Sequence, residues 1–163
     1  MNIIVREYRD QDLPEMMAIW NEIVEDGIAF PQLEPLTREE AMALFSEQSF
    51  TGVAEDLDSG RVLGLYILHP NNIGRCGHIS NASYGVLSQA RGLKVGEKLV
   101  RHSINKGREL GFGVLQFNAV VKTNASAIHL YEKLGFVRLG TIPKGFLMKD
   151  GTFEDIILFY LTL

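Results

Sequence analysis

The chain has 163 residues and a net charge of −4, with 46% hydrophobic and 22% charged residues. This balance is typical of one globular domain over residues 1–163, and it argues against nucleic acid binding, which needs a basic face. No apolar run approaches the roughly 20 residues of a membrane span. The N-terminus has no signal-peptide pattern, and the single cysteine excludes an intrachain disulfide, so we expect a cytoplasmic protein.

The first half of the chain predicts one strand, two helices and a hairpin. Residues 2–8 open with Ile-Ile-Val, which is typical of a short strand. Apolar residues at helical spacing predict a helix over 13–26, followed by an apolar loop over 28–36. Thr37 and Glu40 form a capping-box pattern, which predicts a second helix that ends near residue 48. Strands over 51–55 and 62–69 flank the turn cluster 56–60.

The second half predicts two more helices, each between strands. Residues 78–87 have strand composition, and Gly85 within them suggests a bulge or a close backbone approach. Helices are predicted over 95–109 and 124–134, separated by a strand over 114–121. Strands over 136–142 and 156–161 surround a loop over 143–152. The expected order is β-α-α-β-β-β-α-β-α-β-β.

A glycine-containing loop precedes the third predicted helix. It reads Arg91-Gly92-Leu93-Lys94-Val95-Gly96. Free backbone N–H groups at a helix N-terminus bind anions, and the two basic side chains add positive charge. An ordinary strand-to-helix turn is the alternative, because the loop has neither dinucleotide-binding nor P-loop spacing.

This loop resembles motif A of the GCN5-related N-acetyltransferase (GNAT) family, Q/R-x-x-G-x-G/A, with Lys94 in place of the central glycine. A lysine can still present its backbone N–H there, provided that its φ stays negative. The segment Asn124–Phe136 resembles the family's N-x-x-A-x-x-x-Y-x-x-x-G-F pattern at all five fixed positions. The two motifs have the family's separation, and the element order is the family's.

The resemblance implies an α/β fold of the α+β type, with a mixed, centrally splayed sheet flanked by about four helices. It also implies acetyl-CoA as co-substrate and direct attack by an amine, without an acyl-enzyme. The expected cofactor-binding residues lie on the strand end, on the loop and at the start of the last helix: Gly85, Val86, Leu87, Arg91, Gly92, Leu93, Lys94, Val95, Gly96 and Asn124. Backbone N–H groups of residues 85–87 would polarise the thioester.

Tyr131 is the expected general acid. A phenol, with a pKa of about 10, stays protonated at neutral pH and can donate a proton to the leaving sulfur. Its position on the apolar stripe of a helix also fits a core tyrosine. Asn124 could cap the same helix, bind the cofactor, or do both.

Two asparagines are expected to hold the substrate. The stretch around Asn118 resembles that of fungal acetyltransferases that act on proline analogues, which also place an asparagine on the preceding strand, where Asn81 lies here. Asparagine is depleted in strands, and its amide can bind both an amine and a carboxylate. Asn118 would thereby also assist catalysis. The alternative is that both amides bond a bulge or a loop.

The general base is not evident from the sequence. Glu22, Glu25 and Asp26 end the first helix and could face the acceptor, although solvated helix charges are the simpler interpretation. Phe30 would wall the substrate pocket, by resemblance. The four histidines show no ligand spacing, so no metal is expected, and nothing activates Cys76.

The sequence therefore predicts an acetyl-CoA-dependent N-acetyltransferase that acts on a small amino-acid-like amine. The partner is a small-molecule substrate, with no nucleic acid and no membrane. A protein N-terminal or lysine acetyltransferase, and a non-catalytic acyl-CoA-binding module, are the alternatives. The last strands could form a homodimer interface, by analogy with relatives.

Overall fold

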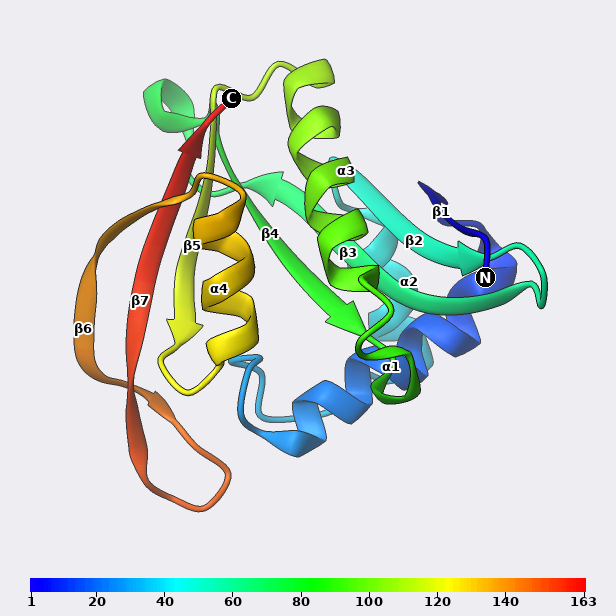
Figure 1. Ribbon diagram of the computed structural model, residues 1–163, viewed down its shortest axis with the longest axis horizontal. Helices are drawn as coiled ribbons and strands as arrows, with labels where there is room; N and C mark the ends of the chain where they lie inside the picture. Colours follow the sequence, from blue (N-terminus) through cyan, green and yellow to red (C-terminus); the bar gives the residue numbers. More distant parts are fainter.

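The computed structural model describes all residues, 1–163, as one mixed seven-stranded sheet with helices on both faces (Figure 1). The strands are β1 (Ile3–Glu7), β2 (Phe50–Asp56), β3 (Arg61–Pro70), β4 (Ile79–Val86), β5 (Val114–Val121), β6 (Val137–Leu147) and β7 (Phe153–Thr162). The helices are α1 (Leu13–Asp26), α2 (Arg38–Ser46), α3 (Val95–Glu109) and α4 (Ala125–Lys133). The predicted element order is confirmed. None of the helices combines the length and apolar character that a membrane crossing requires.

Local sequence signals set the helix ends. The Thr37 side chain accepts a hydrogen bond from the Glu40 N–H, and the Glu40 carboxylate accepts from the Thr37 N–H, so the predicted capping box opens α2. Gly27 ends α1 with a left-handed φ of 63°, a conformation that glycine adopts without steric cost.

The core has two layers, one on each face of the sheet. Along β3, Leu65 and Ile67 face α1 and α2, whereas Tyr66 and Leu68 face α3. This alternation follows from the two-residue period of a strand. The α1–α2 layer includes Trp20 and Phe45, which are 1% exposed.

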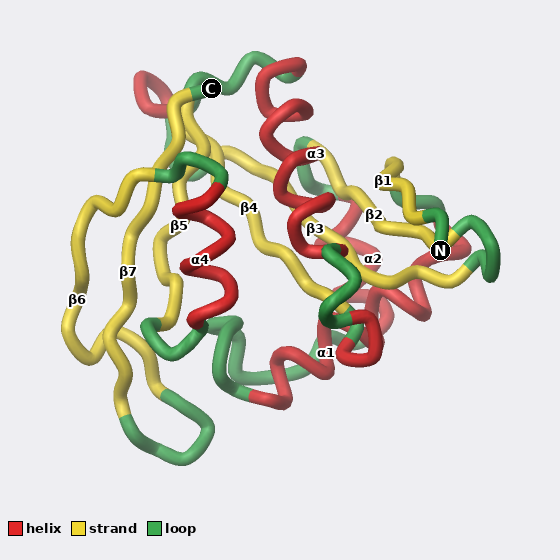
Figure 2. The backbone as a smooth tube through the Cα atoms, in the orientation of Figure 1, coloured by secondary structure: helices red, strands yellow, loops and turns green.

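The sheet divides in its middle, between β4 and β5. Strand order is β1-β2-β3-β4-β5-β7-β6, and only the β4–β5 pair is parallel. That pairing covers Ile79–Asn81 against Val114–Gln116 and then stops. Beyond it the two strands diverge, with α4 over β5 and α3 over β4 (Figures 1 and 2). The expected mixed, centrally splayed sheet with four helices is confirmed.

The structure decides between the two alternatives for Gly85 and corrects one predicted loop. The β3–β4 register runs without a shift from Gly64–Val86 to Pro70–Ser80, so β4 has no bulge at Gly85 against β3. Gly85 instead permits a close approach, because a Cβ there would lie 2.9 Å from Ile23 Cδ1. The first half of the predicted loop over 143–152 is strand, since β6 continues to Leu147, and the loop before β7, which begins at Phe153, is limited to residues 148–152.

Candidate active site

Two cavities open from the divided sheet and meet between β4 and β5. The larger, of about 790 Å³, lies between α3 and α4, and we call it the cofactor cavity. The smaller, of about 270 Å³, lies toward the α1–α2 loop, and we call it the acceptor pocket. Six residues line both: Ala29, Phe30, Tyr84, Asn124, Ala127 and Tyr131. A ligand in each cavity could therefore meet the other across the gap in the sheet.

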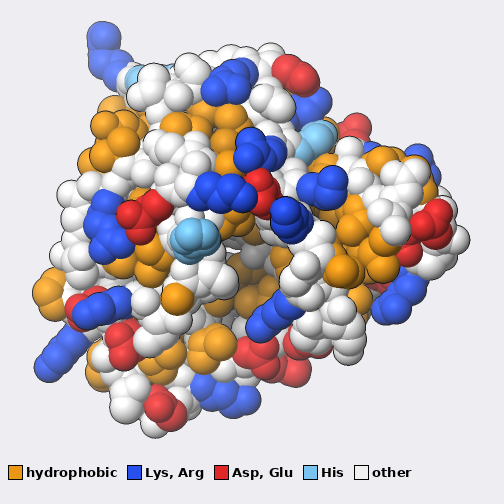
Figure 3. Space-filling model, in the orientation of Figure 1, with side chains coloured by type: hydrophobic (Ala, Val, Ile, Leu, Met, Phe, Trp, Pro, Cys, Tyr) orange, Lys and Arg blue, Asp and Glu red, His pale blue; other side chains and the backbone are white.

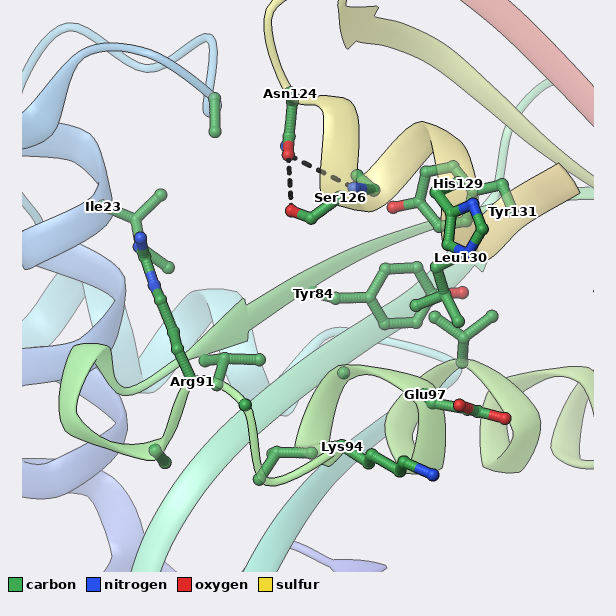
Figure 4. Close-up of a pocket in the computed structure, with 18 of the residues that line it drawn as sticks. Ile23, Tyr84, Arg91, Lys94, Glu97, Asn124, Ser126, His129, Leu130 and Tyr131 are labelled. Atoms are coloured by element: carbon green, nitrogen blue, oxygen red, sulfur yellow. Dashed lines mark hydrogen bonds between the residues drawn. The ribbon is translucent and has the colours of Figure 1, made fainter. Parts of the chain in front are cut away.

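The loop before α3 presents a cluster of free backbone donors to the cofactor cavity. The first intrahelical bond of α3 runs from the Lys98 N–H to the Lys94 carbonyl, and no bond is made by the N–H groups of Val95 and Gly96. Gly92, Lys94, Val95 and Gly96 line the cavity, and Arg91 extends across it toward Ile23 (Figure 4). This arrangement suits a phosphate or pyrophosphate.

Lys94 adopts a left-handed conformation, with φ of 61°. The condition of a negative φ, stated for Lys94 to present its backbone N–H, is therefore not met. The loop needs a left-handed residue at the helix entrance, and Lys94 meets that need at a steric cost that glycine would avoid.

Positive charge surrounds the mouth of the cofactor cavity. In the space-filling view a hollow lies between α3 and α4, and Lys and Arg side chains gather on its rim (Figure 3). Two acids, Asp26 and Glu97, line this cavity. Glu97 accepts from Arg101 at 2.9 Å and from Lys133 at 3.1 Å, so hydrogen bonds from Lys133 and Arg101 lower its pKa and its charge is compensated.

The end of β4 offers one free backbone donor to the gap. The Leu87 N–H donates to the Leu63 carbonyl at 2.8 Å. Hydrogen-bonded pairs alternate in an antiparallel ladder, so Gly85 also faces β3, and the Val86 N–H faces the gap. Of the three predicted donors at 85–87, only Val86 is thus available, and it lines the cofactor cavity. Gly85, Leu87 and Leu93 do not line it.

Tyr131 lies on α4 where the two cavities meet (Figure 4). Its ring packs against Phe117 and Phe136, with centroids 4.4 and 5.6 Å away. Burial raises the pKa of the phenol above its ordinary value. The hydroxyl forms no hydrogen bond with the protein, so its proton is free for a ligand.

Tyr84 faces Tyr131 but differs in its hydroxyl. The Tyr84 Oη lies 2.7 Å from Ser103 Oγ on α3, and burial raises its pKa well above the ordinary value. The Tyr84 hydroxyl is therefore engaged in a hydrogen bond within the protein, unlike that of Tyr131. Asn124 caps α4, since its Oδ1 accepts from the Ala127 N–H at 3.3 Å, and it lines both cavities.

Asn81 and Asn118 both bond the loop after β3, which is the alternative left open for them, through Asn71, a residue that the sequence did not indicate. Both side-chain amides donate to Asn71 Oδ1, at 3.3 Å from Asn81 and 2.7 Å from Asn118. Gln116 Nε2 donates to Asn118 Oδ1 at 3.0 Å. Both halves of the Asn118 amide are thus engaged, whereas Asn81 Oδ1 has no protein partner. These amides lie where β4 and β5 separate.

The end of α1 does not supply the acceptor pocket with an acid. Glu22 and Glu25 line neither cavity, and Asp26 lines the cofactor cavity. The predicted substrate role of Glu25 is therefore wrong, because its side chain lies on the exposed face of α1. Phe30 is 8% exposed, packs 4.5 Å from the Trp20 ring and lines both cavities. No cluster of three or more His, Cys, Asp or Glu side chains could hold a metal ion.

Comparison with known proteins agrees with this geometry. The model of the acetyltransferase (GNAT) family matches residues 7–136. The chain belongs to this family, as its two motifs predict.

Three relatives illustrate the similarity. N-acetyltransferase aca1 of Schizosaccharomyces pombe is 31% identical over 134 residues, which are 73% of this chain and 64% of aca1. "Putative phosphinothricin acetyltransferase YwnH" of Bacillus subtilis is 29% identical over 96% of this chain and 95% of its own. A GCN5-related N-acetyltransferase from Kribbella flavida has 35% identity and a TM-score of 0.92, covering 99% of this chain and 98% of its own.

Proposed function

We propose that this protein transfers the acetyl group of acetyl-CoA directly to the amine of a small amino-acid-like molecule. The observation that carries the proposal is the meeting of the two cavities at Tyr131. A donor bound from one face of the sheet and an acceptor bound from the other would bring thioester and amine together there. Holding two reactants side by side in this way turns a bimolecular reaction into an effectively unimolecular step.

The cofactor cavity supports acetyl-CoA as the donor. Its volume of about 790 Å³ falls within the usual range for cofactor sites. The free N–H groups of Val95 and Gly96 would bind the pyrophosphate, and the Val86 N–H would bond the pantetheine arm within the gap. Neighbours of known structure include one described as solved with its cofactor acetyl-CoA.

Tyr131 is the proposed general acid. The amine nitrogen attacks the thioester carbon, the carbon–sulfur bond breaks, and the departing sulfur takes the Tyr131 proton. A phenol with a raised pKa stays protonated until the thiolate forms beside it.

The acceptor pocket supports a small substrate. At about 270 Å³ it admits a molecule of amino-acid size, and Phe30, Pro31 and Phe117 line it. The Asn81 Oδ1 is free to accept from an ammonium group. The name of YwnH points to an amino-acid-like amine, phosphinothricin, which extends to this chain only as a proposal. The cytoplasmic location and the homodimer stay predictions.

A thiol-release assay tests the proposal. Acetyl-CoA would be combined with L-phosphinothricin, cyclic proline analogues, other amino acids, polyamines, aminoglycosides and short peptides. We expect turnover with small amino acids or their analogues. Turnover only with peptides would favour a protein acetyltransferase instead, and acetyl-CoA binding without any acceptor-dependent turnover would favour a binding module.

A further inference from the structure

The acceptor pocket contains one imidazole, the side chain that most often serves as a general base. Sixteen residues line it, and none is Asp, Glu, Lys or Arg. Tyr84 and Tyr131 are its other ionisable groups, and burial raises the pKa of each phenol, so both stay protonated. His69 is the remaining candidate for a base in the pocket.

His69 occupies the end of β3, beside the proposed amine site. It is paired with Asn81 in the β3–β4 ladder, so the two side chains leave the same face of the sheet, about 5 Å apart at Cβ. Asn81 is held in turn by Asn71. The histidine is half-buried and lines the acceptor pocket.

A hydrogen bond fixes which ring nitrogen is free. His69 Nδ1 lies 3.0 Å from the Pro70 carbonyl oxygen. A carbonyl can only accept, so Nδ1 carries the proton in this bond. Nε2 then holds a lone pair, and it has no partner in the protein. This tautomer therefore leaves Nε2 able to accept a proton.

No charged group in the acceptor pocket competes with His69. The α1–α2 loop contributes Ala29, Phe30 and Pro31, β5 contributes residues 117–121, and α4 with its cap contributes Asn124, Ala127 and Tyr131. The neighbouring strand β4 contributes residues 81–84, of which only Tyr84 is ionisable. No other side chain in this pocket can therefore accept the proton of the acceptor amine.

We propose that His69 is the general base of the acetyl transfer, a role that rests on the function proposed above. His69 Nε2 takes one proton from the ammonium form of the acceptor, directly or through one water, and releases it to solvent. The free amine then forms the nitrogen–carbon bond, and the carbon–sulfur bond breaks. The second nitrogen proton leaves to Nε2 while Tyr131 protonates the sulfur, so the products are the amide and the free thiol. Tyr131 regains a proton through His69 or water.

The first test compares His69→Gln with wild type on L-phosphinothricin and cyclic proline analogues. Glutamine keeps polarity and approximate volume but cannot accept the proton. We expect kcat/KM for the amine to fall about 100-fold at pH 7, with KM for acetyl-CoA unchanged. The wild-type rate should fall on acidification, and that acidic limb should be absent from the variant. His78→Gln is the matched control, because His78 is exposed and lines neither cavity.

A second test adds imidazole to His69→Ala. A missing base is replaced by a soluble one, so activity should rise with imidazole concentration, whereas a merely structural role would not be rescued. If His69→Gln retains wild-type kcat/KM and the same acidic limb, His69 is not the base. If wild type itself turns over no amine, the proposed function fails instead.

A third measurement needs no acceptor. Nitrogen-15 NMR of the histidine rings in wild type, with His69→Gln used to assign the signal, reports the tautomer at neutral pH. We expect His69 to carry its proton on Nδ1. Finding the proton on Nε2 would overturn the proposal even if no substrate were known.

Discussion

Tyr131 lies where both cavities meet and is the proposed proton donor. Its hydroxyl has no protein partner, so Tyr131→Phe removes a proton donor without breaking a hydrogen bond. We expect kcat to fall about 100-fold, with KM for acetyl-CoA nearly constant and the free energy of unfolding changed by less than about 0.5 kcal/mol. Steady-state kinetics and urea unfolding measure these quantities.

Tyr160→Phe is the matched control for that prediction, since Tyr160 on β7 lines neither cavity. Equal kcat values for Tyr131→Phe and wild type would mean that Tyr131 only packs in the core and does not donate the proton.

Lys94 makes a second prediction at the residue scale. A non-glycine residue in the left-handed region destabilises the folded chain by roughly 1–2 kcal/mol. Glycine avoids this steric strain, but it increases the conformational entropy of the unfolded chain. Lys94→Gly is therefore expected to raise the free energy of unfolding by about 0.5–1 kcal/mol. Urea unfolding monitored by circular dichroism measures the change.

The same substitution within the helix provides the control for Lys94→Gly. Lys98 lies inside α3, where glycine lowers stability by about 1 kcal/mol. If Lys94→Gly destabilised the protein as Lys98→Gly does, the left-handed conformation at the loop would be wrong.

The elements show how far sequence reasoning reaches. The apolar spacing of α1 and α3 and the capping box of α2 predicted these helices, because periodicity and capping act within one turn or a few. Pro143 and Gly145 suggested a loop, yet β6 passes through both. The strand lies at the sheet edge, where proline is tolerated, and its pairing with β7 shifts register between Ile142 and Phe146.

The candidate site was predicted unevenly for a similar reason. Tyr131, Asn124 and the loop Arg91–Gly96 lie within local motifs and were named from them. Asn71 and His69 became visible only when β3 and β4 were paired, because their roles depend on contacts across the sheet. Glu25 was misassigned because helical spacing alone did not show which face of α1 meets the pocket.

An ion-pair cluster joins β1, β2 and the start of α1. Arg6 Nη1 lies 2.8 Å from Asp12 Oδ2, and Arg6 Nε binds Glu55. Burial would raise the pKa of Asp12, but hydrogen bonds from Arg6 and the Arg9 N–H outweigh it and lower that pKa below its ordinary value. A lowered carboxyl pKa stabilises the fold above the unfolded-state pKa of about 3.9, and this stabilisation is lost as pH falls through the folded-state value.

Asp12→Asn is therefore expected to destabilise the protein by about 2 kcal/mol at pH 7. The difference from wild type should shrink as the pH falls below about 4. Urea midpoints measured between pH 7 and pH 2.5 test both statements. Asp10→Asn, an exposed neighbour, should change little, and a pH-independent effect of Asp12→Asn would exclude the ionic explanation.

For the whole molecule, the gap between β4 and β5 predicts that ligand binding and folding are coupled. Acetyl-CoA would occupy a site that exists only in the folded protein, so a concentration 100 times its Kd adds about 2.7 kcal/mol of stability. For a chain of this size we expect Tm to rise by roughly 5–10 °C. Thermal scans with increasing acetyl-CoA measure this rise.

ATP serves as the control ligand for the thermal scans, because it carries phosphates and an adenine but no pantetheine arm. An equal rise in Tm with ATP would mean that the phosphate loop alone is occupied. No rise in Tm with acetyl-CoA would mean that acetyl-CoA does not bind in the gap.

The divided sheet also gives the protein two strand edges in its interior, one on β4 and one on β5. An unpaired edge is a template for another chain, and most sheets cover or charge theirs. Here, under the proposed function, the covering is the acyl donor itself. A cell short of acetyl-CoA would then hold this enzyme with these two strand edges uncovered. The metabolite would determine how much enzyme persists as well as how fast it works.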